Sequence, residues 1–357
     1  MSVSVELRHI SKRFPGVIAN KDVSLKVQSG SVHALVGENG AGKSTVMKIL
    51  YGMQRPDSGE IFVNGDQKLF KSPHEAIAVG IGMVHQHFML ADNFTVLENI
   101  ILGDEPKRAA QIDFGVARKK ITEMAATYGL EVDPDELVEN LGVGQRQRVE
   151  ILKVLYRGAN ILIFDEPTAV LVPQEVDDLF NALHGLREKG MSIIFISHKL
   201  DEVLRVADEV TVIRAGSTVA EVKSKDVTSK QLAELMVGSE LPKPETKGNT
   251  KRENIVLELN QVTVPSKGAR NLLSNISFKL HAGEVIGIAG VEGNGQSELT
   301  ETILGLLEYT GHISFDGKSI DTESVSERRD LGIGFIPEDR HRQALMLGSP
   351  LWENRIL

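Results

Sequence analysis

The sequence predicts an α/β fold in one full copy followed by one partial copy. Over the first 240 residues, short runs rich in β-branched residues alternate with segments of helical periodicity, as in a parallel sheet covered by helices. Stretches of this region return 252 positions later: Val5–Leu7 (VEL) returns as Leu257–Leu259 (LEL), and Gly59–Gly65 (GEIFVNG) as Gly311–Gly317 (GHISFDG). Solenoid repeats span only about 20–50 residues, so this long period indicates tandem domains.

The elements of the first copy follow from local patterns. Ile121, Met124, Ala125 and Tyr128 have the i, i+3, i+4, i+7 spacing of one buried helix face. A further helix is predicted at Pro173–Lys189, between two apolar runs. Buried strands are predicted at Val32–Val36, Ile61–Val63, Ile81–Val84, Ile161–Phe164, Ile193–Ile196 and Glu209–Ile213.

A glycine-rich loop, Gly37–Thr45 (GENGAGKST), joins the first of these strands to a predicted helix at Thr45–Leu50. It fits the pattern G-x-x-x-x-G-K-[ST], in which glycines let backbone N–H groups approach phosphate oxygens. Lys43 brings a positive charge to the β- and γ-phosphates, and the Ser44 hydroxyl can reach a magnesium ion. The predicted nucleotide-binding residues of the loop are Gly37, Asn39, Gly40, Gly42, Lys43, Ser44 and Thr45.

The second copy contains a degenerate version of the loop. Gly290–Ser297 reads GVEGNGQS, with Gln296 where the first copy has Lys43. Glutamine carries no charge, so the strongest attraction for a γ-phosphate is missing. We expect one competent nucleotide site and one weakened relative in this chain.

Four further residues are candidates for chemistry. The apolar strand Ile161–Phe164 ends in two acids: Asp165 is placed to hold magnesium through water, and Glu166 to orient or deprotonate an attacking water. His198 leaves the strand after the next predicted helix, so we expect it near the γ-phosphate; the alternative is a structural histidine. Gln86 follows Ile81–Val84 and could contact magnesium or the attacking water; the alternative is a surface glutamine.

Composition restricts the class of protein. The net charge of −9 and the pI near 5.7 argue against nucleic acid as a partner, because such binders rely on a basic face. There is no cysteine, which excludes disulfides and thiolate metal sites. No apolar run approaches the about 20 residues that cross a bilayer, so we expect any membrane role to be peripheral and to depend on partner subunits.

Together the glycine loop, Gln86, Leu141–Gln145, Asp165-Glu166 and His198 resemble, in their order, the ATP-binding cassette superfamily. The resemblance implies a P-loop NTPase fold with a RecA-like core, a small antiparallel β subdomain near the N-terminus and a helical subdomain around Phe88–Gly158. It implies ATP and Mg²⁺ as cofactors, with Ser44, Gln86 and Asp165 at the metal. Phe14 becomes a candidate to stack on adenine; the alternative is a core phenylalanine.

The signature motif departs from the family pattern Leu-Ser-Gly-Gly-Gln, because Leu141–Gln145 reads LGVGQ. The resemblance implies that Gly142, Gly144 and Gln145 contact nucleotide across a pair of cassettes. Gly142 keeps the backbone donor but lacks the serine hydroxyl. Val172 is a second departure, since many cassettes carry aspartate there.

The domain boundaries follow from the repeat. Residues 1–240 form the predicted first nucleotide-binding domain, and the polar segment Leu241–Asn254 (LPKPETKGNTKREN) is the predicted linker. Residues 255–357 form the predicted second domain, which we expect to be truncated: it lacks counterparts of the signature, of the acidic pair and of His198.

Tandem cassettes, the short linker, Gln296 and the stretches His85–Pro106 and Ile336–Arg340 resemble the ATPase subunit of sugar- and nucleoside-type importers. That resemblance implies cassette–cassette dimerisation, two integral-membrane permease subunits docking near Gln86–Leu102, an extracytoplasmic substrate-binding protein acting indirectly, and a place on the cytoplasmic face of the membrane. Phe88, Met89 and Leu90 are the expected docking residues.

Two other functions fit parts of the sequence. A translation-factor cassette protein also has tandem cassettes, but such proteins have longer charged linkers and two intact loops. A nucleotide-binding fragment without turnover would be consistent with Gly142, Gln296 and the partial second copy.

Overall fold

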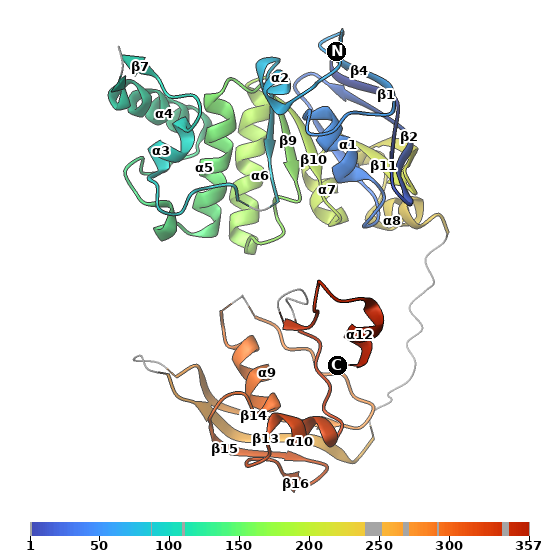
Figure 1. The fold of residues 1–357 in the computed structure, drawn as a ribbon, viewed down its shortest axis with the longest axis vertical. Coiled ribbons are helices and arrows are strands. Elements are labelled where there is room, and N and C mark those ends of the chain that lie inside the picture. The colour runs from blue at the N-terminus through green and yellow to red at the C-terminus, as the bar shows by residue number, and fades with distance from the viewer. Residues whose placement is uncertain are drawn as a thin grey trace. The chain divides into compact units, whose positions relative to one another are not determined.

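The computed structural model describes residues 2–86, 88–108, 111–239, 252–266, 271–290, 293–337 and 343–356. It divides the chain into two compact units, Met1–Lys243 and Pro244–Leu357 (Figure 1). Most of the predicted linker, and residues 338–340 of the IPEDR stretch, lie outside the described residues. No described helix is both long and apolar enough to cross a membrane.

The first unit is built on a ten-stranded sheet in the order β5-β4-β1-β2-β12-β11-β3-β10-β9-β6. Neighbours from β11 to β6 pair in parallel: β11 (Glu209–Arg214), β3 (Val32–Val36), β10 (Ser192–Ile196), β9 (Ile161–Asp165) and β6 (Ile81–Val84). Five of the six predicted strands therefore occur here, and the sixth, Ile61–Val63, lies in the antiparallel strand β4 (Ser58–Val63). β3, β6 and β10 are buried along their whole length, because helices cover both faces.

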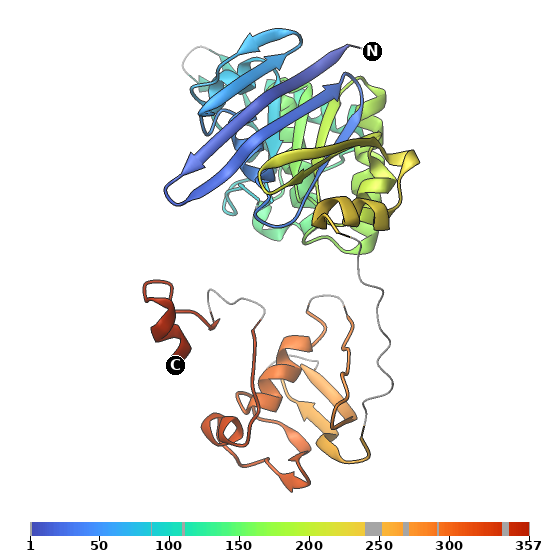
Figure 2. The same ribbon diagram turned by 90° about the vertical axis from the view of Figure 1, so that its right-hand side faces the viewer.

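The antiparallel strands lie beside this parallel sheet. They are β1 (Val3–Phe14), β2 (Val17–Gln28), β4 (Ser58–Val63), β5 (Asp66–Lys68) and β12 (Ser217–Lys223). Figure 2 shows the long β1 and β2 strands, in blue, crossing one side of the unit. The antiparallel β subdomain is thus present as expected.

Alternate residues of the central strands enter two apolar cores, one on each face of the sheet. Ile193 and Phe195 pack with α3 (Val96–Ile101), α4 (Phe114–Tyr128), α5 (Val143–Tyr156) and α6 (Pro173–Glu188). Ile194 and Ile196 pack with α1 (Lys43–Leu50), α2 (Pro73–Ala78) and the antiparallel strands. The period-two alternation of strand side chains explains this division. The remaining helices of the unit are α7 (Leu200–Val206) and α8 (Ser229–Val237).

The predicted helices are confirmed with small changes at their ends. On α4, Ile121 and Ala125 are buried, and Met124 and Tyr128 pack beside them. The helix after the glycine loop begins at Lys43, two residues earlier than predicted. α3, α4 and α5 all lie within the predicted helical subdomain, and Figure 1 shows them together at one end of the unit.

The second unit repeats the N-terminal part of the first. Its sheet has the order β14-β13-β15-β16, with β13 (Ile255–Val264), β14 (Leu273–His281), β15 (Thr310–Phe315) and β16 (Lys318–Ser319). Its helices include α9 (Gln296–Leu304), α10 (Val325–Asp330) and α12 (Leu351–Ile356). Positive φ angles recur at equivalent positions: Asn64 (52°) and Asp316 (47°), Gly59 (101°) and Gly311 (96°).

The repeat fails at two core strands. Residues 285–289 and 333–336 correspond to β3 and β6 but form no strand, and Val285 and Ile336 are 95% and 87% exposed. In the first unit β3 lies between β10 and β11, and β6 pairs with β9. The described residues of the second unit contain no counterparts of β9, β10 or β11, so these segments lack neighbours to pair with.

Candidate nucleotide site

The glycine loop wraps around the ammonium group of Lys43. Lys43 Nζ donates to Gly37 O at 2.8 Å and to Glu38 O at 3.1 Å, and the side chain is buried. An ammonium has three N–H groups, so one remains for a ligand in the loop. Burial lowers the pKa of Lys43, while the nearby carboxylates of Glu166 and Asp165 oppose that shift.

Glycine is required at the turn into α1. Gly42 caps α1 at φ 101°, and a Cβ added there would be 2.3 Å from Ala19 O. No side chain caps the start of α1, and its first turn holds no acid. Its free N–H groups therefore face the loop with the positive end of the helix dipole, which suits an anion such as phosphate.

The acidic pair lies at the carboxyl end of β9. Burial, and secondly the neighbouring Glu166, raise the pKa of Asp165, while Lys43 acts in the opposite direction. Glu166 has a positive φ of 49°, and its N–H is held by Ile196 O at 3.0 Å. Positive φ is strained for glutamate, and such strain persists where the surrounding structure fixes it.

The three predicted catalytic side chains lie together, with Gln86 and His198 both at the carboxylate of Glu166. Gln86 Nε2 donates to Glu166 Oε2 at 3.4 Å, and His198 Nδ1 lies 3.3 Å from Glu166 Oε1. They come from the ends of β6, β9 and β10, which are adjacent in the sheet. Because parallel strands end at the same edge, residues spread over more than one hundred positions form one cluster beside Lys43.

The residues present fit a magnesium nucleotide. Among the described residues, no group of three or more His, Asp or Glu side chains is placed to hold a metal by itself. Magnesium usually binds one or two carboxylates and takes its other ligands from phosphate and water. Asp165 and the exposed Ser44 at the start of α1 are donors of that kind.

Two other predicted contacts lie away from this cluster. The signature residues 141–145 begin α5, with Gly142 as its N-cap, and among the described residues no hydrogen bond or ion pair joins them to the loop. Figure 1 places α5 between α4 and α6, and α1 beside β1 and β2. Phe14 ends β1 and is 39% exposed, with Lys12 Nζ 5.7 Å from the ring centroid. It is therefore not a core residue.

The second loop keeps the glycine cap of its helix and loses the cation. Gly295 caps α9 at φ 100°, nearly the value of Gly42, again without a side-chain cap. The Gln296 side chain lies over Gly290, where an added Cβ would be 2.3 Å from its Nε2. The residue that caps the helix thus has the same backbone conformation in both copies, while the helix itself begins with a lysine in one and a glutamine in the other.

One residue that supports the glycine loop belongs to none of the sequence motifs. Asn20 on β2 is fully buried and donates through Nδ2 to Gly42 O at 3.1 Å, which fixes the loop from behind. Comparison of the two copies could have identified Asn20, because Leu273 stands at the equivalent position and packs against Gly295. An apolar residue there removes a polar support from the second loop.

The comparisons with known proteins agree with this geometry. A family model described as "ABC transporter" matches residues 20–169 and 273–349. The chain is 46% identical over 98% of its length to the nucleoside import ATP-binding protein NupA of Lactococcus lactis, of which it covers 69%. It is 45% identical over its full length to the guanosine import ATP-binding protein NupO of Bacillus subtilis, of which it covers 70%.

Solved structures give the same result for the fold. An ATP-binding cassette of an ABC transporter, in its ADP conformation, aligns with a TM-score of 0.60 and 27% identity over 67% of this chain and all of that one. A nucleotide-free cassette aligns with a TM-score of 0.59. The predicted P-loop NTPase fold is therefore confirmed, and the chain belongs to the ABC transporter family.

Proposed function

We propose that this chain binds ATP and Mg²⁺ at residues 37–45 and hydrolyses ATP to energise import of a nucleoside or simple sugar through partner permeases. The observation that carries the proposal is the cluster of Gln86, Glu166 and His198 beside Lys43. Relatives named for nucleoside, guanosine and glucose import support the class of substrate.

Each residue of the site has a role that follows from its chemistry. The free N–H of Lys43 and the backbone donors at Gly40, Gly42 and Thr45 hold phosphate oxygens, with Gly37 and Asn39 shaping the loop. Ser44, Asp165 and Gln86 would hold magnesium, and its charge would neutralise the phosphates. Glu166 orients or deprotonates the attacking water, and His198 fixes the carboxylate of Glu166.

The domain assignment extends the proposal. Residues 1–240 act as the first cassette, 241–254 as a linker and 255–357 as part of a second cassette. Gly142, Gly144 and Gln145 face nucleotide on the opposite cassette of a pair, and Phe14 stacks on adenine. The exposure of Phe14 at the end of β1 supports that role.

In this proposal the chain docks onto two permease subunits on the cytoplasmic face of the membrane. An extracytoplasmic binding protein acts through those permeases. Met89 supports this: its side chain is 63% exposed beside a cavity of about 140 Å³ between α5 and β6. Its backbone is held on both sides, because Met89 N–H donates to Glu150 and Met89 O accepts from Lys153. The backbone of this exposed residue is therefore held in place.

ATP binding and steady-state hydrolysis with magnesium test the proposal. Lys43→Ala should abolish binding, and Glu166→Gln should keep binding and abolish turnover. Lys225→Ala, an exposed lysine far along the chain, is the control for loss of a positive charge. Binding that survives Lys43→Ala would overturn the assignment of the site.

The same experiment decides a second candidate function. Gln296 removes the cation from the second loop, which favours a chain that binds one nucleotide without efficient turnover. Binding that depends on Lys43 with no hydrolysis in the wild-type chain would support that alternative.

A further inference from the structure

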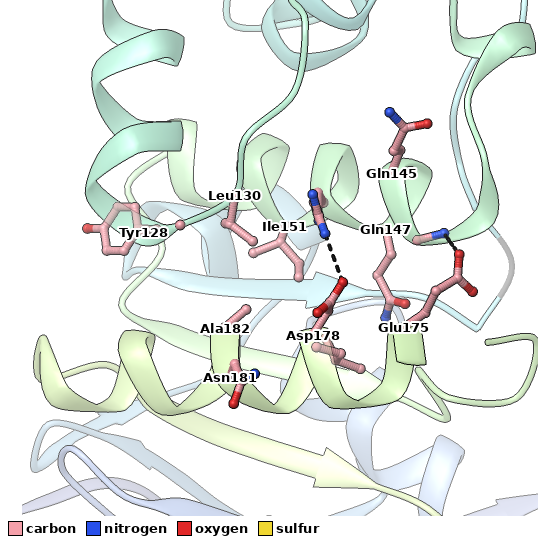
Figure 3. Close-up of a pocket in the computed structure, with 13 residues that line it drawn as sticks. Tyr128, Leu130, Gln145, Gln147, Ile151, Glu175, Asp178, Asn181 and Ala182 are labelled. Carbon is pink, nitrogen blue, oxygen red and sulfur yellow. Dashed lines mark hydrogen bonds and ion pairs between the residues drawn. The ribbon is translucent and has the colours of Figure 1, made fainter. Parts of the chain in front are cut away.

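One carboxylate joins the starts of two helices in the first unit. Glu175 Oε1 accepts from Gly144 N–H at 3.0 Å, and Glu175 Oε2 accepts from Val172 N–H at 3.1 Å. Gly144 is the second residue of α5, and Val172 is the N-cap of α6. Figure 3 shows Glu175 reaching from α6 toward the start of α5.

The geometry makes this a strong link. The first N–H groups of a helix have no partner within the helix, and a carboxylate there gains from the helix dipole and from charge-assisted hydrogen bonds. The close approach depends on glycine: a Cβ at Gly144 would be 2.9 Å from Glu175 Oε1 and 3.1 Å from its Cδ.

Other contacts between α5 and α6 at this place are weaker. Arg148 and Asp178 form an ion pair at 3.1 Å one turn further on, but their side chains are 34% and 61% exposed. Exposed pairs contribute little to stability. A cavity of about 370 Å³, lined by Tyr128, Gln147, Glu175 and their neighbours, separates the two helices beside the link (Figure 3). Glu175 is thus the main polar connection here.

The link leads to the catalytic cluster. α6 follows the loop of residues 167–172, which leaves Asp165 and Glu166 directly. At the other end of this loop, Thr168 Oγ1 donates to Glu202, and Thr168 O accepts from Lys199 Nζ at 3.0 Å. Lys199 is the neighbour of His198. The loop is therefore held on one side by the segment that carries His198, and on the other by Glu175 and the start of α5.

We infer that Glu175 is a positioning residue, through which the start of α5 and the loop of residues 167–172 respond to each other. Its effect on turnover rests on the proposed function, because it acts through the placement of Glu166. Its effect on the two segments does not depend on that function.

Hydrogen–deuterium exchange on the whole chain, without nucleotide, tests the link. Glu175→Ala should speed exchange in residues 142–148 and also in residues 167–174, by about ten-fold or more, as expected for loss of charge-assisted hydrogen bonds. Glu175→Gln retains one acceptor oxygen, so only one segment should lose protection. Asp178→Asn, which breaks the neighbouring ion pair, is the control and should change neither segment to that extent.

A substitution on the opposite helix gives the sharper test. Gly144→Ala pushes Glu175 away from α5, so it should speed exchange in residues 167–174 although residue 144 lies outside that segment. Gly185→Ala on α6, where an added Cβ meets nothing within 4 Å, is the matched control. Exchange that changes only around residue 144 would overturn the inference.

Nucleotide measurements on the same variants separate the two proposals. Glu175→Ala should leave the Kd for ATP within about two-fold and lower kcat, with Glu175→Gln between it and the wild type. A loss of ATP binding as large as in Lys43→Ala would overturn the positioning role. A wild-type chain that does not bind ATP would contradict the proposed function, while the exchange pattern would still decide the link.

Discussion

Lys43 and Gln296 each begin a helix directly after a glycine of positive φ. Gly42 and Gly295 differ by 1° in φ, and both precede a helix without a side-chain cap. At the scale of single residues, therefore, the two loops differ in the charge at this position and in the side chain that packs against the glycine before it. Asn20 donates to the first loop, whereas Leu273 packs against the second.

Gly42→Ala should abolish ATP binding and destabilise the first unit. A residue with a Cβ in the left-handed conformation lowers the free energy of unfolding by about 1–2 kcal/mol. Here the Cβ would also overlap Ala19 O and Asn20 Nδ2. Gly40→Ala is the matched control: Gly40 has φ 82°, but an added Cβ would have no neighbour within 4 Å, so this variant should show the backbone strain without the overlap. Urea unfolding measures the stability of both variants, and ATP titration measures their binding. Equal effects in the two variants would refute the role of close packing.

Asp165→Asn should stabilise the first unit at neutral pH. The raised pKa of Asp165 means that the folded chain holds this proton more tightly than the unfolded chain, so the free energy of unfolding falls as pH rises from 3.8 through the folded pKa. The amide removes that cost at pH 7, and the gain should shrink as pH approaches 3.8. The Tm should rise by about 2–4 °C for each kcal/mol gained.

Thermal unfolding at several pH values, with the exposed Asp226→Asn as control, measures this effect. A Tm for Asp165→Asn equal to or below that of the wild type at pH 7 would show that the attraction of Asp165 to Lys43 outweighs the cost of burial.

At the scale of elements, strand ends and helix starts carry the site. β6, β9 and β10 deliver Gln86, Glu166 and His198 to one edge, and the start of α1 supplies backbone donors. α5 plays a different part. It fixes both backbone groups of Met89 through Glu150 and Lys153, and its own start is fixed by Glu175.

Met89→Glu and Leu90→Glu should behave differently. Met89 is 63% exposed, so its substitution should leave Tm and ATP binding unchanged but weaken co-purification with co-expressed permease partners. Leu90 packs against the apolar core, so a carboxylate there should lower Tm, because an unpaired buried charge is costly. If Met89→Glu kept full association with the permeases, Met89 would have no part in docking.

At the scale of the whole molecule, the two units differ in how far their apolar residues are covered. In the first unit the central strands are buried on both faces. In the second unit Val285, Ile336 and Trp352 are 95%, 87% and 64% exposed. Fewer buried contacts indicate a lower local stability.

The second unit should unfold at lower urea concentration than the first. Trp352 is the only tryptophan, so tryptophan fluorescence reports on the second unit, whereas far-UV circular dichroism reports mostly on the larger first unit. The fluorescence midpoint should come at the lower urea concentration. Coincident midpoints would contradict this prediction.

The exposed apolar residues of the second unit should also bind the dye ANS. Ile336→Ser should reduce binding of ANS more than Val17→Ser, a control at a residue that is 60% exposed in the first unit.

The sequence by itself determined the family, the position of the glycine loop and of the acidic pair, and six of the strands of the first unit. These features depend on neighbouring residues: a glycine pattern, an apolar run and a period of two or 3.6 are local properties of the chain. The departures at Gln296 and Gly142 were readable for the same reason.

Only the tertiary structure decided how these pieces meet. The order of strands in the sheet brings Gln86, Glu166 and His198 together, and it brings Glu175 to Gly144 and Asn20 to Gly42. The need for distant neighbours also explains why residues 285–289 repeat the sequence pattern of β3 without forming a strand. A buried parallel strand is stable only when neighbours from distant parts of the chain complete its hydrogen bonds, and no local pattern supplies them.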